Sequence, residues 1–80
     1  MSDELEKLTN MVLIVIQTYR IVTFGSDEHM QIIELMNNMK SIEEIINNDN
    51  KYIKKALKYI RENKYLSNKL KEDDININLQ

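Results

Sequence analysis

The most distinctive group of functional side chains in this sequence is a cluster of eight cations in one stretch of the chain. Residues 51–71 contain seven lysines, one arginine and a single acid, whereas residues 1–50 contain nine acids and three bases. The formal net charge of −2 therefore hides a basic segment on an acidic chain. Clustered lysines neutralise the phosphates of nucleic acids, so this asymmetry indicates a polyanionic partner. The alternative is a helix face whose charges only keep it solvated.

Other reactive groups are sparse. The chain has no cysteine and a single histidine, His29, which we expect on the surface of a helix. Disulfides and thiolate metal sites are therefore excluded. The sequence also lacks a Ser/His/Asp set, a pair of carboxylates in a recognisable motif and a glycine-rich phosphate loop. We expect no enzymatic activity, no metal and no cofactor.

The sequence shows neither an export signal nor a membrane span. Its first residues, "MSDELEK", are acidic, whereas a signal peptide begins with basic residues. The apolar run "MVLIVI" is much shorter than the roughly 20 residues that cross a bilayer. We therefore expect a cytoplasmic protein without a membrane partner, located at the nucleoid if it binds DNA.

Helices are expected to position the cations, because the sequence has no proline and only one glycine. The first predicted helix covers residues 3–24 and ends at Gly25. Its apolar residues recur at spacings of three and four, the pattern of a helix that packs along another helix. A second apolar face adjoins this stripe, so we expect residues 1–25 to be a dimerisation arm. The expected homodimer interface comprises Leu8, Met11, Val12, Ile14, Val15 and Ile21.

Three further helices are predicted in the next part of the chain. Ser26 is expected to cap the second helix. Ser41 and Glu44 match a capping box, which predicts a short third helix. The Asn/Asp cluster at residues 47–50 predicts a turn, after which Asn50 can cap a fourth helix. The expected buried stripe of this helix is Ile53, Ala56, Leu57 and Ile60, at helical spacing.

A β-hairpin is predicted behind the fourth helix. Asn63 is expected to end that helix with left-handed backbone, and the two strands are expected near residues 65–70 and 74–79. The run "DININL" alternates polar and apolar residues with the period of a strand. The alternative for these last residues is a frayed tail.

The order of these elements resembles that of a winged helix-turn-helix domain over residues 26–79. The resemblance is carried by "SIEEI" at residues 41–45, a four-residue turn, "ALKYI" at residues 56–60 and "ENKYL" at residues 62–66. It implies a mainly α fold with a small C-terminal hairpin, preceded by a long N-terminal helix, in which residues 26–80 form the winged domain. The chain departs from the family pattern in its glycine-free turn, in a lysine where glycine often follows the fourth helix, and in an acidic wing tip.

In such a domain the fourth helix enters the major groove. A rotation of 100° per residue places Lys51, Lys55 and Lys58 opposite the buried stripe. The residues expected to contact DNA are Asn50, Lys51, Tyr52, Lys54, Lys55, Lys58, Arg61, Lys69 and Lys71.

We therefore predict a small, sequence-specific double-stranded DNA-binding protein that regulates transcription as a homodimer. The alternative is a protein-interaction module or inhibitor that docks a larger protein or nucleoprotein through the same basic face, since a fold does not fix a function.

Overall fold

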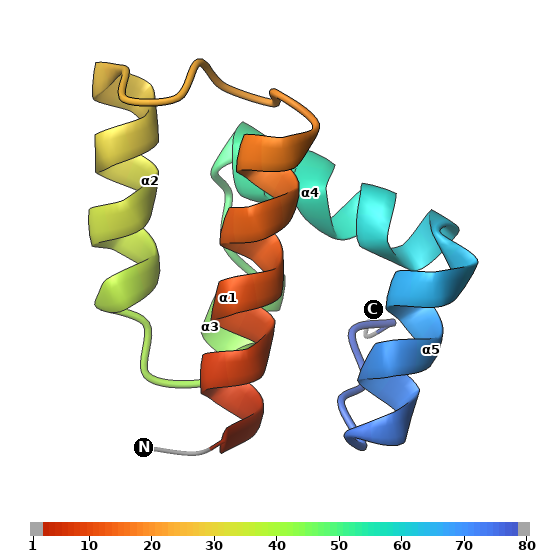
Figure 1. The fold of residues 1–80 in the computed structure, drawn as a ribbon. Helices are drawn as coiled ribbons and strands as arrows, with labels where there is room; N and C mark the ends of the chain where they lie inside the picture. Colours follow the sequence, from red (N-terminus) through yellow and green to blue (C-terminus); the bar gives the residue numbers. More distant parts are fainter. Residues whose placement is uncertain (1–2, 79–80) are drawn as a thin grey trace.

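The structure, a computed structural model, describes residues 3–78 and consists of helices joined by short connections. In Figure 1, α1 stands between α2 and α5, and α3 and α4 pack behind it. α1 contacts α2, α3 and α4, and α4 also contacts α3 and α5. The helices are α1 (Asp3–Thr18), α2 (Asp27–Asn37), α3 (Ile42–Ile46), α4 (Lys51–Glu62) and α5 (Lys64–Glu72).

Polar caps set the starts of α2 and α3, where the sequence predicts them. Ser26 Oγ accepts a hydrogen bond from the His29 backbone N–H at 3.2 Å. Ser41 Oγ accepts from the Glu44 N–H at 3.2 Å, and Glu44 Oε1 accepts from the N–H of Lys40 at 3.0 Å. In a standard capping box the Glu44 side chain would accept from the N–H of Ser41. Here it accepts from the N–H of Lys40, one residue earlier.

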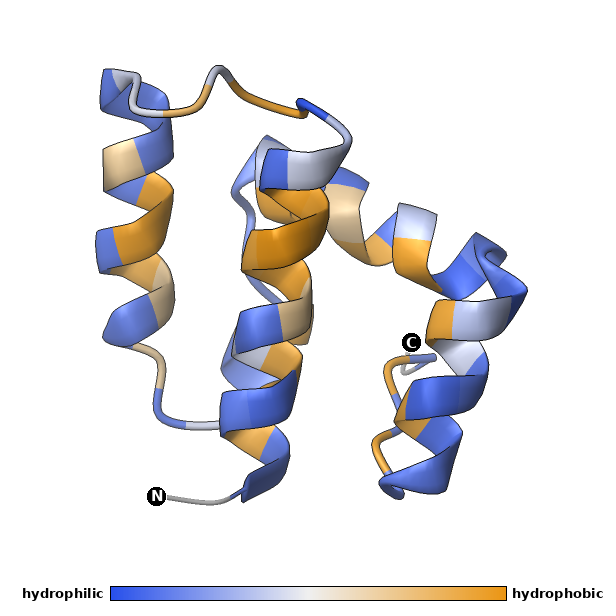
Figure 2. Ribbon diagram, viewed as in Figure 1, coloured by the Kyte–Doolittle hydropathy of each residue, from blue (hydrophilic) through white to orange (hydrophobic). Residues whose placement is uncertain are grey.

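One hydrophobic core runs through the molecule, and α1 lies in it. Leu8, Val12 and Ile16 are fully buried in this core, so the part of the chain predicted as an arm packs against the part predicted as the domain. The other elements contribute the buried residues Ile32, Met36, Ile45, Ile53, Ala56, Leu57, Ile60, Leu70, Ile75 and Ile77. Figure 2 shows α5 as mostly hydrophilic, with apolar residues on the chain beside it.

Three of the six residues predicted at the dimer interface are buried in this core. Leu8, Val12 and Val15 are at most 2% exposed within one chain, so they cannot also contact a second copy of this fold. Met11 and Ile21 are half-buried against the core. Of the six predicted interface residues, Ile14 alone is largely exposed, at 61%.

The predicted winged fold is wrong, because the chain after α4 forms a helix and no hairpin. Asn63 has extended backbone, with φ −94° and ψ 115°, and its Oδ1 accepts a hydrogen bond from the Leu66 N–H at 2.9 Å. It therefore ends α4 and also caps α5. Leu66 and Leu70, four residues apart, lie on one side of a helix and pack against the core. Helix-favouring leucine, lysine and glutamate surround them.

Residues 73–78, here called the C-terminal segment, begin with a turn at Asp73 and Asp74, where Asp74 has φ +58°, and the structure has no β-strand within residues 3–78. Ile75 and Ile77 are 4% exposed, whereas Asn76 and Asn78 face solvent. The period of two in "DININL" therefore identifies which residues of this segment are buried, and the segment covers the core without forming a strand. The last residue of the predicted hairpin, Leu79, lies outside the described residues.

Candidate nucleic-acid interface

Lys51, Lys54, Lys55 and Lys58, here called the lysine face, occupy the outer side of α4. All four are exposed. The opposite side of α4 carries residues that are at most 1% exposed, namely Ile53, Ala56, Leu57 and Ile60. The core therefore fixes the rotation of α4 and directs the lysine face to solvent.

No carboxylate neutralises the lysine face. The one ion pair within residues 3–78 joins Lys7 Nζ to Asp73 Oδ1 at 3.2 Å, far from these lysines in the sequence. The nearest acids along the chain are Asp49, in the turn before α4, and Glu62, in its last turn. Four unpaired ammonium groups over two helical turns create a locally positive surface on a chain of net charge −2.

The start of α4 is engaged in intramolecular contacts. Asn50 Oδ1 accepts hydrogen bonds from the Tyr52 and Ile53 N–H groups at 2.9 and 3.1 Å. The Tyr52 ring is half-buried, and the ammonium of Lys51 lies 5.1 Å from its centroid, in a cation–π contact. The Asn50 oxygen is therefore used by the cap and the Tyr52 ring is partly covered, whereas the Asn50 NH₂ group stays available as a donor.

Arg61 is directed toward the C-terminal segment. Its Nε donates a hydrogen bond to the carbonyl oxygen of Ile77 at 3.0 Å. The sequence predicts Arg61 beside the lysines as a DNA contact, but the structure assigns it a second role, because it ties α4 to the end of the described chain. The buried Ile77 gives this tie its fixed geometry.

The two lysines predicted on a wing strand lie on α5. Lys69 is 5.8 Å from the centroid of the Tyr65 ring, which is 69% exposed. Tyr59, by contrast, stacks on Tyr19 with 4.1 Å between ring centroids, and the hydrogen bond with Tyr19 raises the pKa of Tyr59. Tyr65 is therefore the ring in this basic region that is open to stacking on a base.

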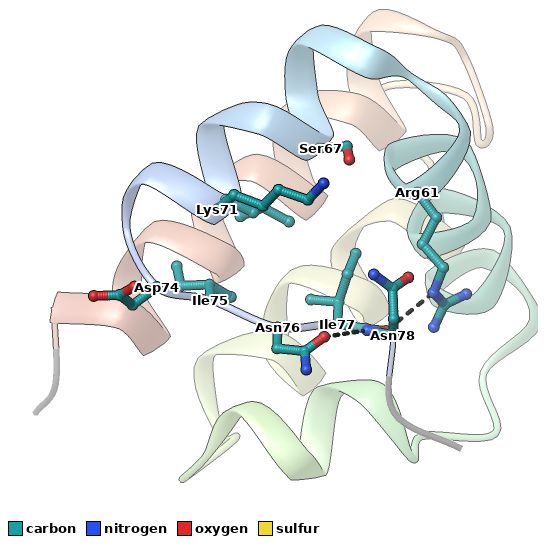
Figure 3. Close-up of a pocket in the computed structure, with 9 residues that line it drawn as sticks. Arg61, Ser67, Lys71, Asp74, Ile75, Asn76, Ile77 and Asn78 are labelled. Carbon is teal, nitrogen blue, oxygen red and sulfur yellow. Dashed lines mark hydrogen bonds between the residues drawn. The ribbon is translucent and has the colours of Figure 1, made fainter.

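Lys71 and Arg61 line a pocket of about 380 Å³ between α4, α5 and the C-terminal segment (Figure 3). Ser67, Asp74 and Asn76 also line it. Sequence reasoning missed this pocket, because a hairpin would have carried the last residues away from α4. The alternation of Ile75 and Ile77 with asparagines was the available signal, since it requires a core surface for the segment to cover.

His29 is buried, contrary to the expectation of a surface residue. It is 5% exposed, its Nδ1 accepts a hydrogen bond from the Gly25 N–H at 2.9 Å, and its ring lies 5.0 Å from that of Phe24. Gly25 has φ +79°, a conformation that favours glycine. His29 therefore fixes the connection between α1 and α2.

The rest of the described chain offers no other obvious centre of chemistry. Between residues 3 and 78, no three side chains of His, Asp or Glu are grouped so as to hold a metal ion. The helices of the same range also lack the length and apolar character needed to cross a membrane. Comparison of the chain with protein-family models, curated proteins and solved structures gives no match. The functional argument therefore depends on the geometry of α4, α5 and the C-terminal segment.

Proposed function

We propose that this protein binds double-stranded DNA by placing the lysine face of α4 against the phosphate backbone. The observation that carries the proposal is the set of four exposed lysines, without ion pairs to described carboxylates, on one side of a helix. Each such lysine can neutralise one phosphate and release its condensed counterions.

The dimensions of α4 fit this role. Lys51 and Lys58 are roughly 10 Å apart along the helix axis, at 1.5 Å per residue. The major groove of B-DNA is about 12 Å wide and admits a helix between its two phosphate backbones. α3 and the four-residue turn before α4 hold the helix against the core, so the lysine face is presented as a rigid unit.

The acidic remainder of the chain restricts the orientation of binding. The first turns of α1, α2 and α3 each carry two or three carboxylates. These would be repelled by phosphates, so a duplex approaching any of these helix starts is disfavoured. The same repulsion limits non-specific binding in other orientations. Regulation of transcription at a defined site would require base contacts in addition.

Titration of a fluorescent 20-base-pair duplex at 50 mM salt tests the proposal. Wild-type protein should give saturable binding, and Lys55→Glu should weaken it on the order of tenfold, because it removes one phosphate contact and adds a repulsive charge. Lys40→Glu is the matched control, since Lys40 is an exposed lysine outside the lysine face. We expect this control to bind within about threefold of wild type, a change of about 0.7 kcal/mol.

Two results would contradict the proposal. The first is an absence of duplex binding by the wild type at low salt, and the second is equal weakening by Lys55→Glu and Lys40→Glu. The first would favour the alternative in which the lysine face docks an acidic protein surface, and the second would mean that duplex binding is not localised to the lysine face.

A further inference from the structure

The pocket between α4, α5 and the C-terminal segment gathers cations and hydrogen-bond donors that the lysine face does not use. Arg61 comes from the last turn of α4, Ser67 and Lys71 from α5, and Asn76 from the C-terminal segment. These residues are distant in the sequence or on different elements, and the fold brings them to one hollow (Figure 3).

Arg61 is held in a defined orientation at this pocket. Its Nε–H is used by the Ile77 carbonyl at 3.0 Å. A guanidinium has five N–H donors, so four remain on its two terminal nitrogens, which form no hydrogen bond or ion pair with the described residues. An arginine whose plane is fixed in this way loses less side-chain entropy when it binds an anion.

The α5 side of the pocket supplies a second cation and a hydroxyl. Ser67 and Lys71 are four residues apart and therefore share one side of the helix. Figure 3 shows the Lys71 side chain extending along α5 toward Ser67, with Arg61 across the hollow. On the third side, Asn76 Oδ1 accepts from the Asn78 N–H at 3.0 Å, which leaves the Asn76 NH₂ group as a donor.

We propose that this pocket binds a phosphate group, held between Arg61 and Lys71. A phosphate offers several oxygens to donors that approach from different sides, whereas a carboxylate offers two oxygens in one plane. The volume of about 380 Å³ exceeds what a phosphate alone needs and falls within the range of small-ligand sites.

Asp74 also lines the pocket, and Figure 3 shows its carboxylate directed away from Arg61 and Lys71. The volume that a phosphate leaves unfilled has room for an attached group such as a sugar. The ligand class is therefore a phosphate, free or esterified. Such a phosphate has two sources, a small phosphorylated molecule or the backbone of a nucleic acid. The nucleic-acid source depends on the DNA binding proposed above, whereas phosphate binding by the pocket does not depend on it.

Nuclear magnetic resonance of the full chain, titrated with inorganic phosphate at pH 7.5 and constant ionic strength, tests the proposal. We expect saturable shifts of the Arg61 Nε–H and of the backbone amides of Ser67, Lys71 and residues 74–78. Half-saturation is expected on the order of 1–10 mM, as for a single weakly held ion. A titration with chloride in place of phosphate should leave these signals unchanged.

Lys71→Gln should weaken phosphate binding about tenfold. Lys69→Gln, two residues away on α5 and not among the pocket-lining residues, changes the charge equally and should leave binding within about twofold. Circular dichroism of both variants verifies that the helices are retained. Absence of saturable shifts in the wild type, or equal weakening by the two substitutions, would overturn the proposal.

Two additional titrations identify the source of the phosphate. If a small ligand is the source, adenosine 5′-monophosphate should bind at least tenfold more tightly than phosphate and shift the same signals. If nucleic acid is the source, a duplex should displace bound phosphate from the Arg61 signal. Duplex binding without any effect of phosphate would refute phosphate binding by the pocket and leave DNA binding by the lysine face supported. Phosphate binding without duplex binding would support the pocket and refute DNA binding by the lysine face.

Discussion

Replacing Lys51, Lys55 and Lys58 together by glutamine should change the salt dependence of duplex binding by a calculable amount. If each of the four lysines of the lysine face neutralises one phosphate, the slope of log K against log salt is about −3.6. Affinity should then fall about 150-fold between 50 and 200 mM salt. With three lysines removed, the slope should be about −0.9 and the loss over the same range only about 3.5-fold.

The triple substitution is suited to this test because it leaves the fold in place. The three side chains are exposed and form no ion pair with described residues, and glutamine has a helix propensity close to that of lysine. Fluorescence anisotropy with a labelled duplex at 50, 100 and 200 mM salt gives the slopes, and thermal unfolding verifies that stability is retained. A triple variant whose slope stays near that of the wild type would refute the assignment, because other cations would then be making the phosphate contacts.

Three other predictions concern the fold and the oligomeric state. Asn63→Ala should cost about 1 kcal/mol in urea unfolding, because the α5 cap to the Leu66 N–H is lost; an unchanged midpoint would mean that α5 does not depend on this cap. Ile77→Ala should cost about 2–5 kcal/mol, as for other fully buried isoleucines, and a cost below about 0.5 kcal/mol would indicate a frayed end. Sedimentation equilibrium at tens of micromolar should give the monomer mass of 9.6 kDa, because burial of Ile14 alone contributes about 1.5–3 kcal/mol, less than the cost of association. Twice that mass, reduced by Ile14→Glu, would instead support the homodimer predicted from the sequence.

Local signals in the sequence were sufficient for the presence of the first four helices and for the lysine face, but the first helix ends at Thr18 and not at Gly25 as predicted. Ser26, Ser41 and Asn50 each cap the helix that they were expected to cap. The stripe on α4 is buried as expected, since residues at spacings of three and four can face only one side of a helix. The expected direction of the lysines follows from that stripe alone.

The predictions from the sequence were wrong where one local pattern is compatible with two structures. Asn63 is compatible with either end of a helix, and only its hydrogen bond to the Leu66 N–H decides that a new helix begins there. The alternation around Ile75 and Ile77 fits a paired strand and an unpaired covering segment equally well. His29 was predicted on the surface because the group that it bonds, the Gly25 N–H, lies in a connection whose path the sequence does not determine.

If the protein binds DNA as proposed, the absence of a wing changes the kind of DNA recognition that we expect. Phosphate contacts position a protein on DNA, whereas base contacts select a sequence. At the start of α4, the Asn50 oxygen caps the helix and the Tyr52 ring is half-buried beneath Lys51. The groups that remain available are the Asn50 NH₂ group and the lysine ammonium groups, and the ammonium groups bind phosphates in any sequence as well as guanine edges.

A single chain should therefore bind duplexes with little sequence preference. Its dissociation constants are expected in the range of about 10⁻⁴–10⁻⁶ M that is typical of non-specific binding at physiological salt. Measurements on several unrelated 20-base-pair duplexes should agree within about threefold. A duplex bound more than a hundredfold more tightly, a difference of about 2.7 kcal/mol, would contradict this reasoning, because it would require more base contacts than the exposed lysines and the Asn50 NH₂ group offer in the free protein.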